Sequence, residues 1–173
     1  MTIGREELFR HSQFSKRSAM LYFVYGTLKR GFPNHSILYK ENFIAHATTE
    51  GILYENGIPY FVPEEKYVGL FGLKDFKEDV DQVLKQKRKA PAIEFQNRVY
   101  GEVYEIYHEN TWSELDRLEG YRGHDVHGLY DRFLYSVLID GKFEWAWTYG
   151  LRNGKEKMID AVPVKSGIYT KVY

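Results

Sequence analysis

The stretch LYFVYGTLKRG, residues 21–31, decides the fold of this chain. Its first five residues are all aliphatic or aromatic, which is the length and composition of a buried β-strand. Gly26 interrupts the strand, so the N–H groups that follow have no strand partner. Consecutive free N–H groups in a turn bind anions, and a glycine lets a ligand come close to the backbone. The stretch therefore predicts a core strand that runs into a ligand-binding turn, with an ordinary strand end as the alternative.

The composition predicts a globular, sheet-rich protein. The chain has 173 residues, enough for one domain with a sizeable core, and 17% of them are aromatic. Its 24 basic and 24 acidic residues cancel, so no overall charge attracts it to nucleic acid or to an anionic membrane. The absence of cysteine excludes disulfides, thiolate zinc sites and a cysteine nucleophile, and it favours a cytoplasmic location.

The chain is expected to form one domain behind a short leader. Residues 1–20 contain no apolar segment of signal-peptide length, and no stretch approaches the 18 consecutive apolar residues of a membrane span. We expect residues 1–20 to be an N-terminal extension without a catalytic role. Residues 21–173 contain no repeat, low-complexity run or linker, so we expect them to form a single domain.

Several segments beyond the first strand have the pattern of β-strands. Asn56-Gly57 lies between two apolar runs and is a strong hairpin signal, and Asp140-Gly141 has the same role near the C-terminus. Gly101, inside a third alternating segment, indicates a bulge or a close approach of another backbone. The strands are expected at 43–54, 58–62, 98–107, 133–139 and 143–149.

Residues 75–90 have the pattern of an amphipathic helix. Apolar residues recur at helical spacing behind Asp75, a candidate N-cap, and Pro91 is expected to end the helix. Four basic residues lie in the tail, 85–89. Because cations are favoured at a helix C-terminus, this tail is interpreted as a solvated face rather than as a nucleic-acid site.

A second helix is expected to end at Glu119. Thr111 and Glu114 have the spacing of a capping box, and Gly120 has the position that ends a helix. A carboxylate in the last turn faces the negative end of the helix dipole, which raises its pKa. Glu119 is therefore either an ordinary exposed residue, whose unfavourable position lowers the stability slightly, or a residue retained for chemistry.

Other constellations are weaker. His124, Asp125 and His127 lie in a glycine-bracketed loop without a third ligand at defined spacing, so we expect no metal site. Ser36 and Ser113 lack the glycine context of a serine hydrolase. No glycine-rich nucleotide-binding motif is present.

Taken in order, the motifs resemble those of a known family. VYGTLKRG with PNH behind it, GILYENGIPYF, VYGEVYEI, LDRLEGY, YDR and AWTY, spanning residues 21–149, are similar to the gamma-glutamylcyclotransferase-like superfamily. Within it they resemble the gamma-glutamylamine cyclotransferase branch. The resemblance implies an α+β fold, a small, mostly antiparallel β-barrel flanked by helices. The chain departs from the pattern at residues 70–97, a longer helical segment than expected.

The resemblance also implies a site and a reaction. Tyr25, Gly26, Thr27 and Leu28 become the substrate-binding loop, and Glu119 becomes the catalytic carboxyl. The implied enzyme cyclises the γ-glutamyl group of a small molecule to 5-oxoproline and releases an amine, without metal or cofactor. A carboxyl of raised pKa suits this reaction, because it must accept a proton and return it. The alternative is a non-catalytic domain that uses the same pocket to bind a γ-glutamyl-like ligand or a protein partner, and the oligomeric state is left open.

Overall fold

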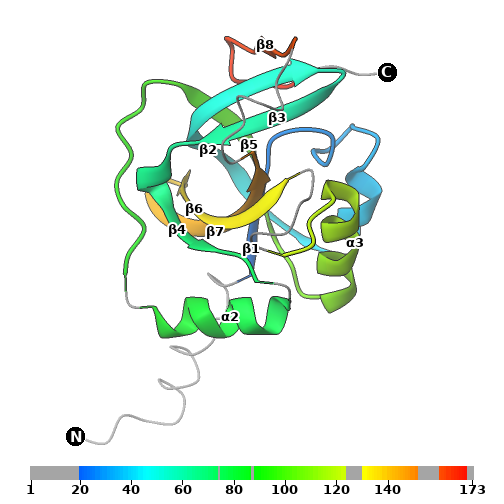
Figure 1. Ribbon diagram of the computed structural model, residues 1–173, viewed down its shortest axis with the longest axis vertical. Helices are drawn as coiled ribbons and strands as arrows, with labels where there is room; N and C mark the ends of the chain where they lie inside the picture. The colour runs from blue at the N-terminus through cyan, green and yellow to red at the C-terminus, as the bar shows by residue number, and fades with distance from the viewer. Residues whose placement is uncertain (1–19, 74, 87, 124–129, 152–159, 171–173) are drawn as a thin grey trace, which may run out of the picture.

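Five strands close into a barrel. The computed structural model describes residues 20–73, 75–86, 88–123, 130–151 and 160–170. The barrel strands are β1 (Leu21–Val24), β2 (Asn42–Asn56), β5 (Arg98–Glu105), β6 (Asp131–Ile139) and β7 (Lys142–Gly150). They follow the order β2-β5-β1-β7-β6, and β6 pairs again with β2, which closes the ring (Figure 1).

Three further strands extend the barrel, and its pairing is mostly antiparallel. β3 (Ile58–Pro63) forms the predicted hairpin with β2, and Gly57 between them has a φ of 74°. β4 (Val68–Phe71) pairs with β6, and β8 (Val162–Pro163) pairs with β2. Only the β1–β7 pairing is parallel among the described strands. The predicted fold class, a small, mostly antiparallel β-barrel flanked by helices, is confirmed.

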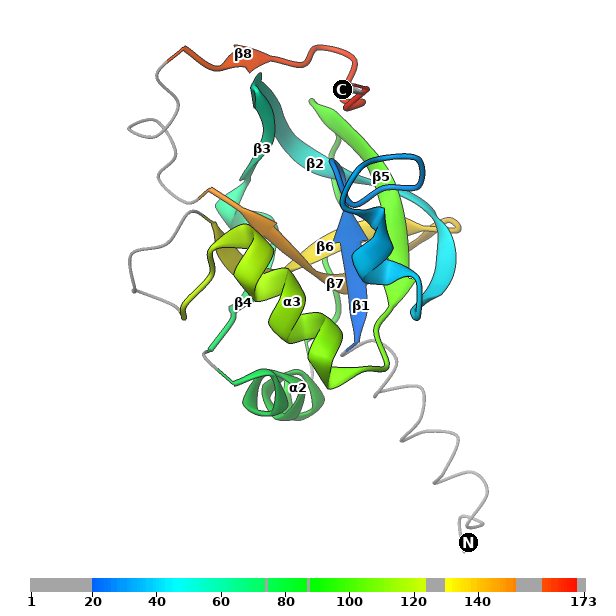
Figure 2. The ribbon, with the colours of Figure 1, turned by 90° about the vertical axis from the view of Figure 1, so that its right-hand side faces the viewer.

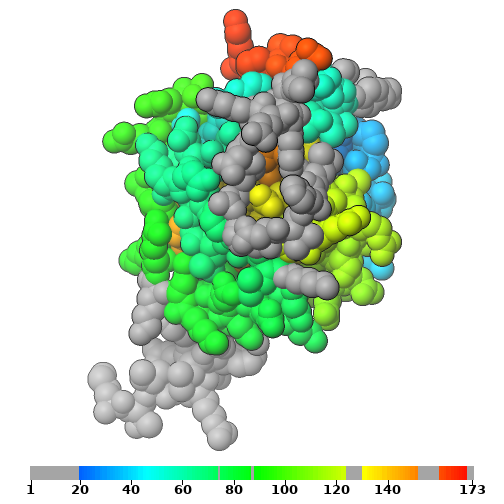
Figure 3. All heavy atoms as spheres, viewed as in Figure 1, coloured from blue at the N-terminus to red at the C-terminus, as the bar shows by residue number. Residues whose placement is uncertain are grey.

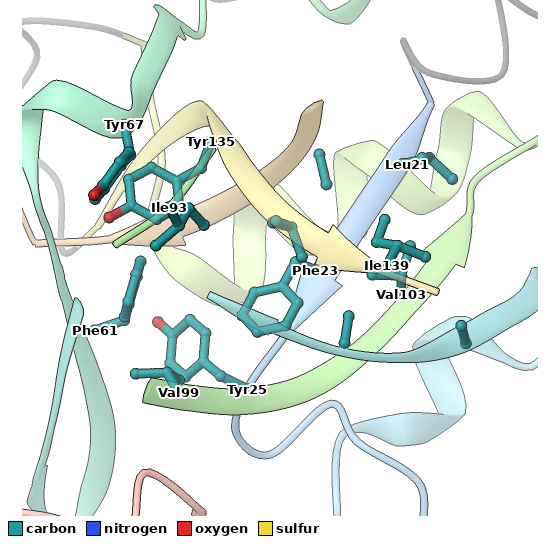
Figure 4. Close-up of a cluster of buried hydrophobic side chains, with 14 of the residues drawn as sticks. Leu21, Phe23, Tyr25, Phe61, Tyr67, Ile93, Val99, Val103, Tyr135 and Ile139 are labelled. Atoms are coloured by element: carbon teal, nitrogen blue, oxygen red, sulfur yellow. The ribbon is translucent and has the colours of Figure 1, made fainter. Parts of the chain in front are cut away.

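Strand β1 is buried on both of its faces. Leu21, Phe23 and Tyr25 belong to the cluster inside the barrel, where Figure 4 shows the ring of Tyr25 near that of Phe61. Tyr22 and Val24 belong to a second cluster, which includes residues of the long helix α3. Successive side chains of a strand point to opposite faces, so a strand covered on both sides must be apolar throughout. This explains the uninterrupted apolar run that opens the motif.

Helix α2 (Phe76–Lys85) begins as predicted but ends early. The Asp75 carboxylate accepts a hydrogen bond from Lys77 N at 2.8 Å, so the predicted N-cap is confirmed. The expected end at Pro91 is wrong. The chain is already extended at Gln86, and it then runs along the barrel, where the carbonyls of Arg88 and Pro91 accept hydrogen bonds from barrel side chains. Those tertiary bonds replace the last helical turn.

Helix α3 (Glu109–Glu119) lies against the barrel in front of β7 and beside β1, with α2 near its N-terminal end (Figure 2). Its predicted end is confirmed, because Gly120 adopts a left-handed conformation with φ 64°. The predicted capping box is wrong, since the helix begins at Glu109. Two short 3₁₀ helices, His35–Leu38 and Glu65–Tyr67, complete the regular structure. None of the helices in the described ranges is long and apolar enough to cross a membrane.

The carboxylate of Glu41, the residue before β2, caps α3 instead. Glu41, whose side chain is fully buried, accepts hydrogen bonds from the backbone N–H groups of Tyr107 (2.6 Å) and His108 (3.3 Å). It also accepts bonds from His108 Nδ1 and Thr111 Oγ1, both at 2.8 Å. A carboxylate has lone pairs for all four donors, whereas a helix N-terminus leaves its own N–H groups unsatisfied. Glu41 therefore fixes the start of the helix that carries Glu119.

We expect Glu41→Gln to lower the free energy of unfolding by about 1–3 kcal/mol, because the amide NH₂ cannot accept the bonds that one carboxylate oxygen accepts. The measurement is urea unfolding followed by circular dichroism. Glu109→Gln is the matched control: its side chain is 64% exposed, and the change should cost less than about 0.5 kcal/mol. Equal stability of the two variants would show that Glu41 does not anchor α3.

Candidate active site

A cavity of about 120 Å³ opens where β1 and α3 end and β3 begins. The five residues predicted for the site all line it: Tyr25, Gly26, Thr27, Leu28 and Glu119. Gly26 and Glu119 are 93 positions apart in the sequence (119 − 26), and the fold brings them to one cavity. Sequence reasoning assigned no site role to the other lining residues, which are Tyr22, Val24, Asn34, Ile58, Pro59, Leu118 and Tyr130.

The loop after β1 presents its backbone to this cavity. A turn closes with Lys29 N donating to Gly26 O at 3.1 Å. A Cβ at Gly26 would lie 2.5 Å from Cγ of Pro59, so only glycine fits here unless the Pro59 ring on β3 shifts. The N–H groups of Gly26, Thr27 and Leu28 find no acceptor among the described residues. They are the available hydrogen-bond donors of the cavity wall.

Asn34, which precedes the short helix His35–Leu38, braces this loop. Its side-chain amide donates to Thr27 Oγ1 at 2.9 Å, and its backbone N–H donates to Thr27 O at 3.0 Å. Its side chain makes no capping bond to the short helix that follows. His35 Nδ1 lies 2.9 Å from Leu28 O and adds a further tie. These bonds hold the loop in one conformation without using its free N–H groups.

Tyr25 contributes the wall rather than a free polar group. Its ring points into the barrel core (Figure 4), and its hydroxyl donates to Tyr149 O at 2.8 Å. Burial raises its pKa well above the ordinary value. Tyr25 therefore fixes the end of β1 and stays neutral.

Glu119 is the one carboxyl among the described residues that line the cavity. It is the last residue of α3, it is partly buried, and its backbone carbonyl accepts a hydrogen bond from Tyr130 N at 3.2 Å. Its carboxyl makes no hydrogen bond or ion pair with any described residue. Burial raises its pKa from 4.5 to about 8. The sequence predicted the direction of this shift from the helix end, whereas the cause in the structure is desolvation by the surrounding side chains.

Two tyrosines beside Glu119 escaped the sequence analysis. Tyr22 lies on the face of β1 opposite the barrel core and interacts electrostatically with the Glu119 carboxylate, as does Tyr130. Tyr130 donates its hydroxyl to Pro59 O at 2.7 Å. The alternation of side chains along residues 21–25 was the signal for Tyr22, because a strand covered on both faces sends every second ring toward the helix.

No metal site is evident in the part of the chain that the structure describes, where no group of three His, Asp or Glu side chains could hold an ion. The sequence candidates His124, Asp125 and His127 lie outside the described residues. The cavity thus combines backbone donors for an anion with a carboxyl that exchanges a proton near neutral pH. Such a site can bind an oxyanion or carboxylate and transfer a proton in the same complex.

Comparisons with known proteins match this architecture. A model of the family "Gamma-glutamyl cyclotransferase, AIG2-like" matches residues 22–82 and 77–171. Two relatives are both named "putative gamma-glutamylcyclotransferase". The protein from Drosophila melanogaster is 32% identical over 145 residues, 83% of this chain and 76% of the relative. The protein from Methanocaldococcus jannaschii is 31% identical over 131 residues, 73% of this chain and 80% of the relative.

Two solved structures share the fold. The AIG2-like protein from Mus musculus superposes with a TM-score of 0.55 at 19% identity, over 89% of this chain and 96% of its own. YkqA from Bacillus subtilis gives a TM-score of 0.55 at 24% identity over 87% of this chain, which spans only 39% of the length of YkqA. The family match covers most of the described barrel and both helices. The chain therefore belongs to the gamma-glutamyl cyclotransferase, AIG2-like family.

Proposed function

We propose that this protein cyclises the γ-glutamyl group of a small molecule to 5-oxoproline and releases an amine, with Glu119 as the proton-transferring residue. The observation that carries this proposal is the Glu119 carboxyl, which has a raised pKa and no partner among the described residues. It lines the same cavity as Gly26, Thr27 and Leu28, whose N–H groups have no described acceptor. Membership in the gamma-glutamyl cyclotransferase family supports the same reaction class.

The nucleophile in this reaction belongs to the substrate. The α-ammonium of the γ-glutamyl group first loses a proton to the Glu119 carboxylate. The free amine then attacks the γ-carbonyl carbon, a C–N bond closes the five-membered ring, and the oxygen becomes an oxyanion. Collapse of this intermediate breaks the original amide C–N bond. Two protons pass in all from the attacking to the departing nitrogen, so Glu119 ends in the state in which it began.

The loop supplies binding and electrostatic stabilisation. Its three free N–H groups suit either the substrate's α-carboxylate or the oxyanion that develops on the γ-carbonyl. Asn34 and His35 hold the loop in place, so the donors need little reorganisation during the reaction. Ring closure within one molecule is already fast once the γ-glutamyl side chain is held in the reactive rotamer. The only further catalytic group that the reaction needs is one that transfers protons.

The rim of the cavity favours a leaving amine that has no uncompensated carboxylate. Ile58 and Leu118 line the cavity and are 39% and 37% exposed. Glu119 is the only acidic or basic side chain among the described lining residues. No described cation there would pair with the glycine carboxylate of glutathione. Together with the PNH motif at residues 33–35, this supports γ-glutamyl amines as substrates.

We expect Glu119→Gln to lower kcat at least about a thousandfold, because one residue serves both proton transfers and acid–base catalysis is worth about 10²–10⁴-fold. The assay is 5-oxoproline release in single turnover from a panel of γ-glutamyl compounds. Glu114→Gln is the control, since Glu114 lies exposed on the same helix and does not line the cavity.

A Glu119→Gln variant that keeps a tenth of the wild-type rate would remove Glu119 as the base. If wild-type protein leaves every compound of the panel intact while one compound raises its Tm, the binding-domain alternative is correct. If no compound reacts or binds, neither proposal stands.

The pH profile follows from the raised pKa of Glu119. The carboxylate is the active form, so kcat/KM should rise with pH and reach half of its plateau near pH 8. Stability should change in the opposite direction. With a folded pKa of about 8 against an ordinary 4.5, the contribution of Glu119 is fully present below about 4.5 and is lost as pH rises through about 8.

Thermal unfolding of wild type and Glu119→Gln at several pH values provides a second readout, since glutamine does not ionise. The Tm of the variant minus that of the wild type should therefore increase as pH rises. An acid limb of kcat/KM near 4.5, with no change in the Tm difference, would contradict the raised pKa.

We expect γ-glutamyl-ε-lysine to be turned over with at least about tenfold higher kcat/KM than glutathione. The lysine carboxylate lies next to its own α-ammonium, whereas the glycine carboxylate of glutathione has no neighbouring cation and is costly to bring to an apolar rim. Steady-state kinetics with both substrates at one pH decide the question. A preference for glutathione would refute the amine specificity and leave the reaction class in place.

A further inference from the structure

A buried guanidinium joins the barrel to both helices. Arg132 of β6 is 0% exposed. Its Nη1 donates to both carboxylate oxygens of Asp116 on α3, at 2.6 and 2.7 Å. Its Nη2 donates to the Asp79 carboxylate on α2 and to Leu73 O. Figures 2 and 3 show α2 and α3 next to each other in two views, and the hydrogen bonds of Arg132 connect the two helices.

The surroundings of this guanidinium are aromatic and dry. Four rings lie with their centroids 4.7–5.9 Å from Arg132 Cζ, those of Phe76, Trp112, Tyr121 and Trp147. Removing one carboxylate of a buried ion pair leaves an uncompensated charge and is strongly destabilising. Asp79 and Asp116 should therefore be similarly important for stability.

The two carboxylates differ in what else they contact. Asp79 has one further hydrogen bond, from Leu73 N at 2.6 Å, which stays within the α2 region. Asp116 Oδ1 accepts a hydrogen bond from the Tyr149 hydroxyl at 2.5 Å. The Tyr149 ring packs edge-on against Tyr22 at 5.7 Å, and Tyr22 lines the cavity beside Glu119.

Asp116 also lies one helical turn before Glu119. Residues three apart on a helix share a face, so the contact of Asp116 with Arg132 sets how the last turn of α3 meets the barrel. The backbone reinforces this, because Asp116 O accepts the N–H of Tyr121 at 2.8 Å and closes the helix end around Gly120. Asp79 makes no direct contact with α3 or with Tyr149 among the described hydrogen bonds and reaches them only through Arg132 and Leu73.

We propose that Asp116 is a positioning residue for the reaction: through Arg132 and Tyr149 it holds the last turn of α3 so that the Glu119 carboxyl faces the loop at Gly26–Leu28. Its kinetic consequences rest on the proposed function. Arg132 and Tyr149 are the partners through which it acts, and Asp79, which contacts Arg132 but not Tyr149, is expected to matter for stability alone.

The ionisation of Glu119 reports its position independently of turnover. The described titratable groups that interact with Glu119 are the phenols of Tyr22, Tyr25, Tyr130 and Tyr149, and burial raises the pKa of each. They remain neutral over the range in which Glu119 titrates. Burial also raises the pKa of Asp116, against the opposing effect of the Arg132 cation. Loosening the helix end would admit water to Glu119 and lower its pKa.

The test compares Asp116→Asn with Asp79→Asn, two isosteric changes at the same guanidinium. We expect both to lower the Tm, but only Asp116→Asn to lower kcat, by about a hundredfold, because small misplacements of a catalytic group have effects of that size. Its KM should stay within about threefold. The acid limb of its kcat/KM profile should move to lower pH, while that of Asp79→Asn stays at the wild-type value.

Carbon-13 NMR of labelled glutamate carboxyls, assigned through Glu119→Gln, measures the same pKa without turnover. If wild type releases no 5-oxoproline, the proposed function fails, and the NMR titration still tests positioning: a lower midpoint only in Asp116→Asn supports it. Tyr149→Phe keeps the guanidinium paired and should lower kcat about fivefold. This variant replaces Asp116→Asn in the test if Asp116→Asn does not fold. Equal kinetic and NMR changes in the two Asp variants, or none in either, would overturn the proposal, as would a fully active Tyr149→Phe if Asp116→Asn does not fold.

Discussion

The burial of β1 on both faces is the constraint on which the rest of the structure depends. One set of its side chains fills the barrel, and the other set, with Tyr22, meets α3 and the cavity. A strand enclosed in this way cannot slip by one residue, because the slip would exchange the two sets of side chains. The chain can therefore turn at only one place, Gly26, where Pro59 leaves no room for a side chain. The loop N–H groups reach the cavity because the strand before them is fixed.

The position of Glu119 destabilises the fold, and other contacts of α3 must offset this. A carboxyl without a partner among the described residues, held at the end of a helix and walled by tyrosines, is unfavourable in its charged form. Two buried clamps hold the helix that carries it. Glu41 binds the N-terminal turn and Arg132 binds the C-terminal half through Asp116. The fold thus fixes α3 at both ends and leaves the one carboxyl that faces the cavity unpaired.

Local signals in the sequence predicted the elements well and the tertiary contacts poorly. Gly120 and Asp75 act on their own backbone neighbours, and both helix boundaries were predicted correctly. The start of α3 was not, because the group that caps it, Glu41, lies 70 positions from Thr111. The cavity was predicted through the family motifs, whereas Tyr22 and the pairing of Arg132 with Asp116 depend on the closure of the barrel. No periodicity in a single sequence encodes which strand and helix meet in this way.

The central claim is that the loop after β1 and the end of α3 form one site for a γ-glutamyl group. The most direct test is titration of nitrogen-15-labelled protein with 5-oxoproline, the product that the site would release, followed through the backbone amide signals. We expect saturable shifts of the Gly26, Thr27 and Leu28 signals together with the amide signal of residue 119, both in wild type and in Glu119→Gln. Unchanged loop signals, with shifts confined to another face of the molecule, would contradict it.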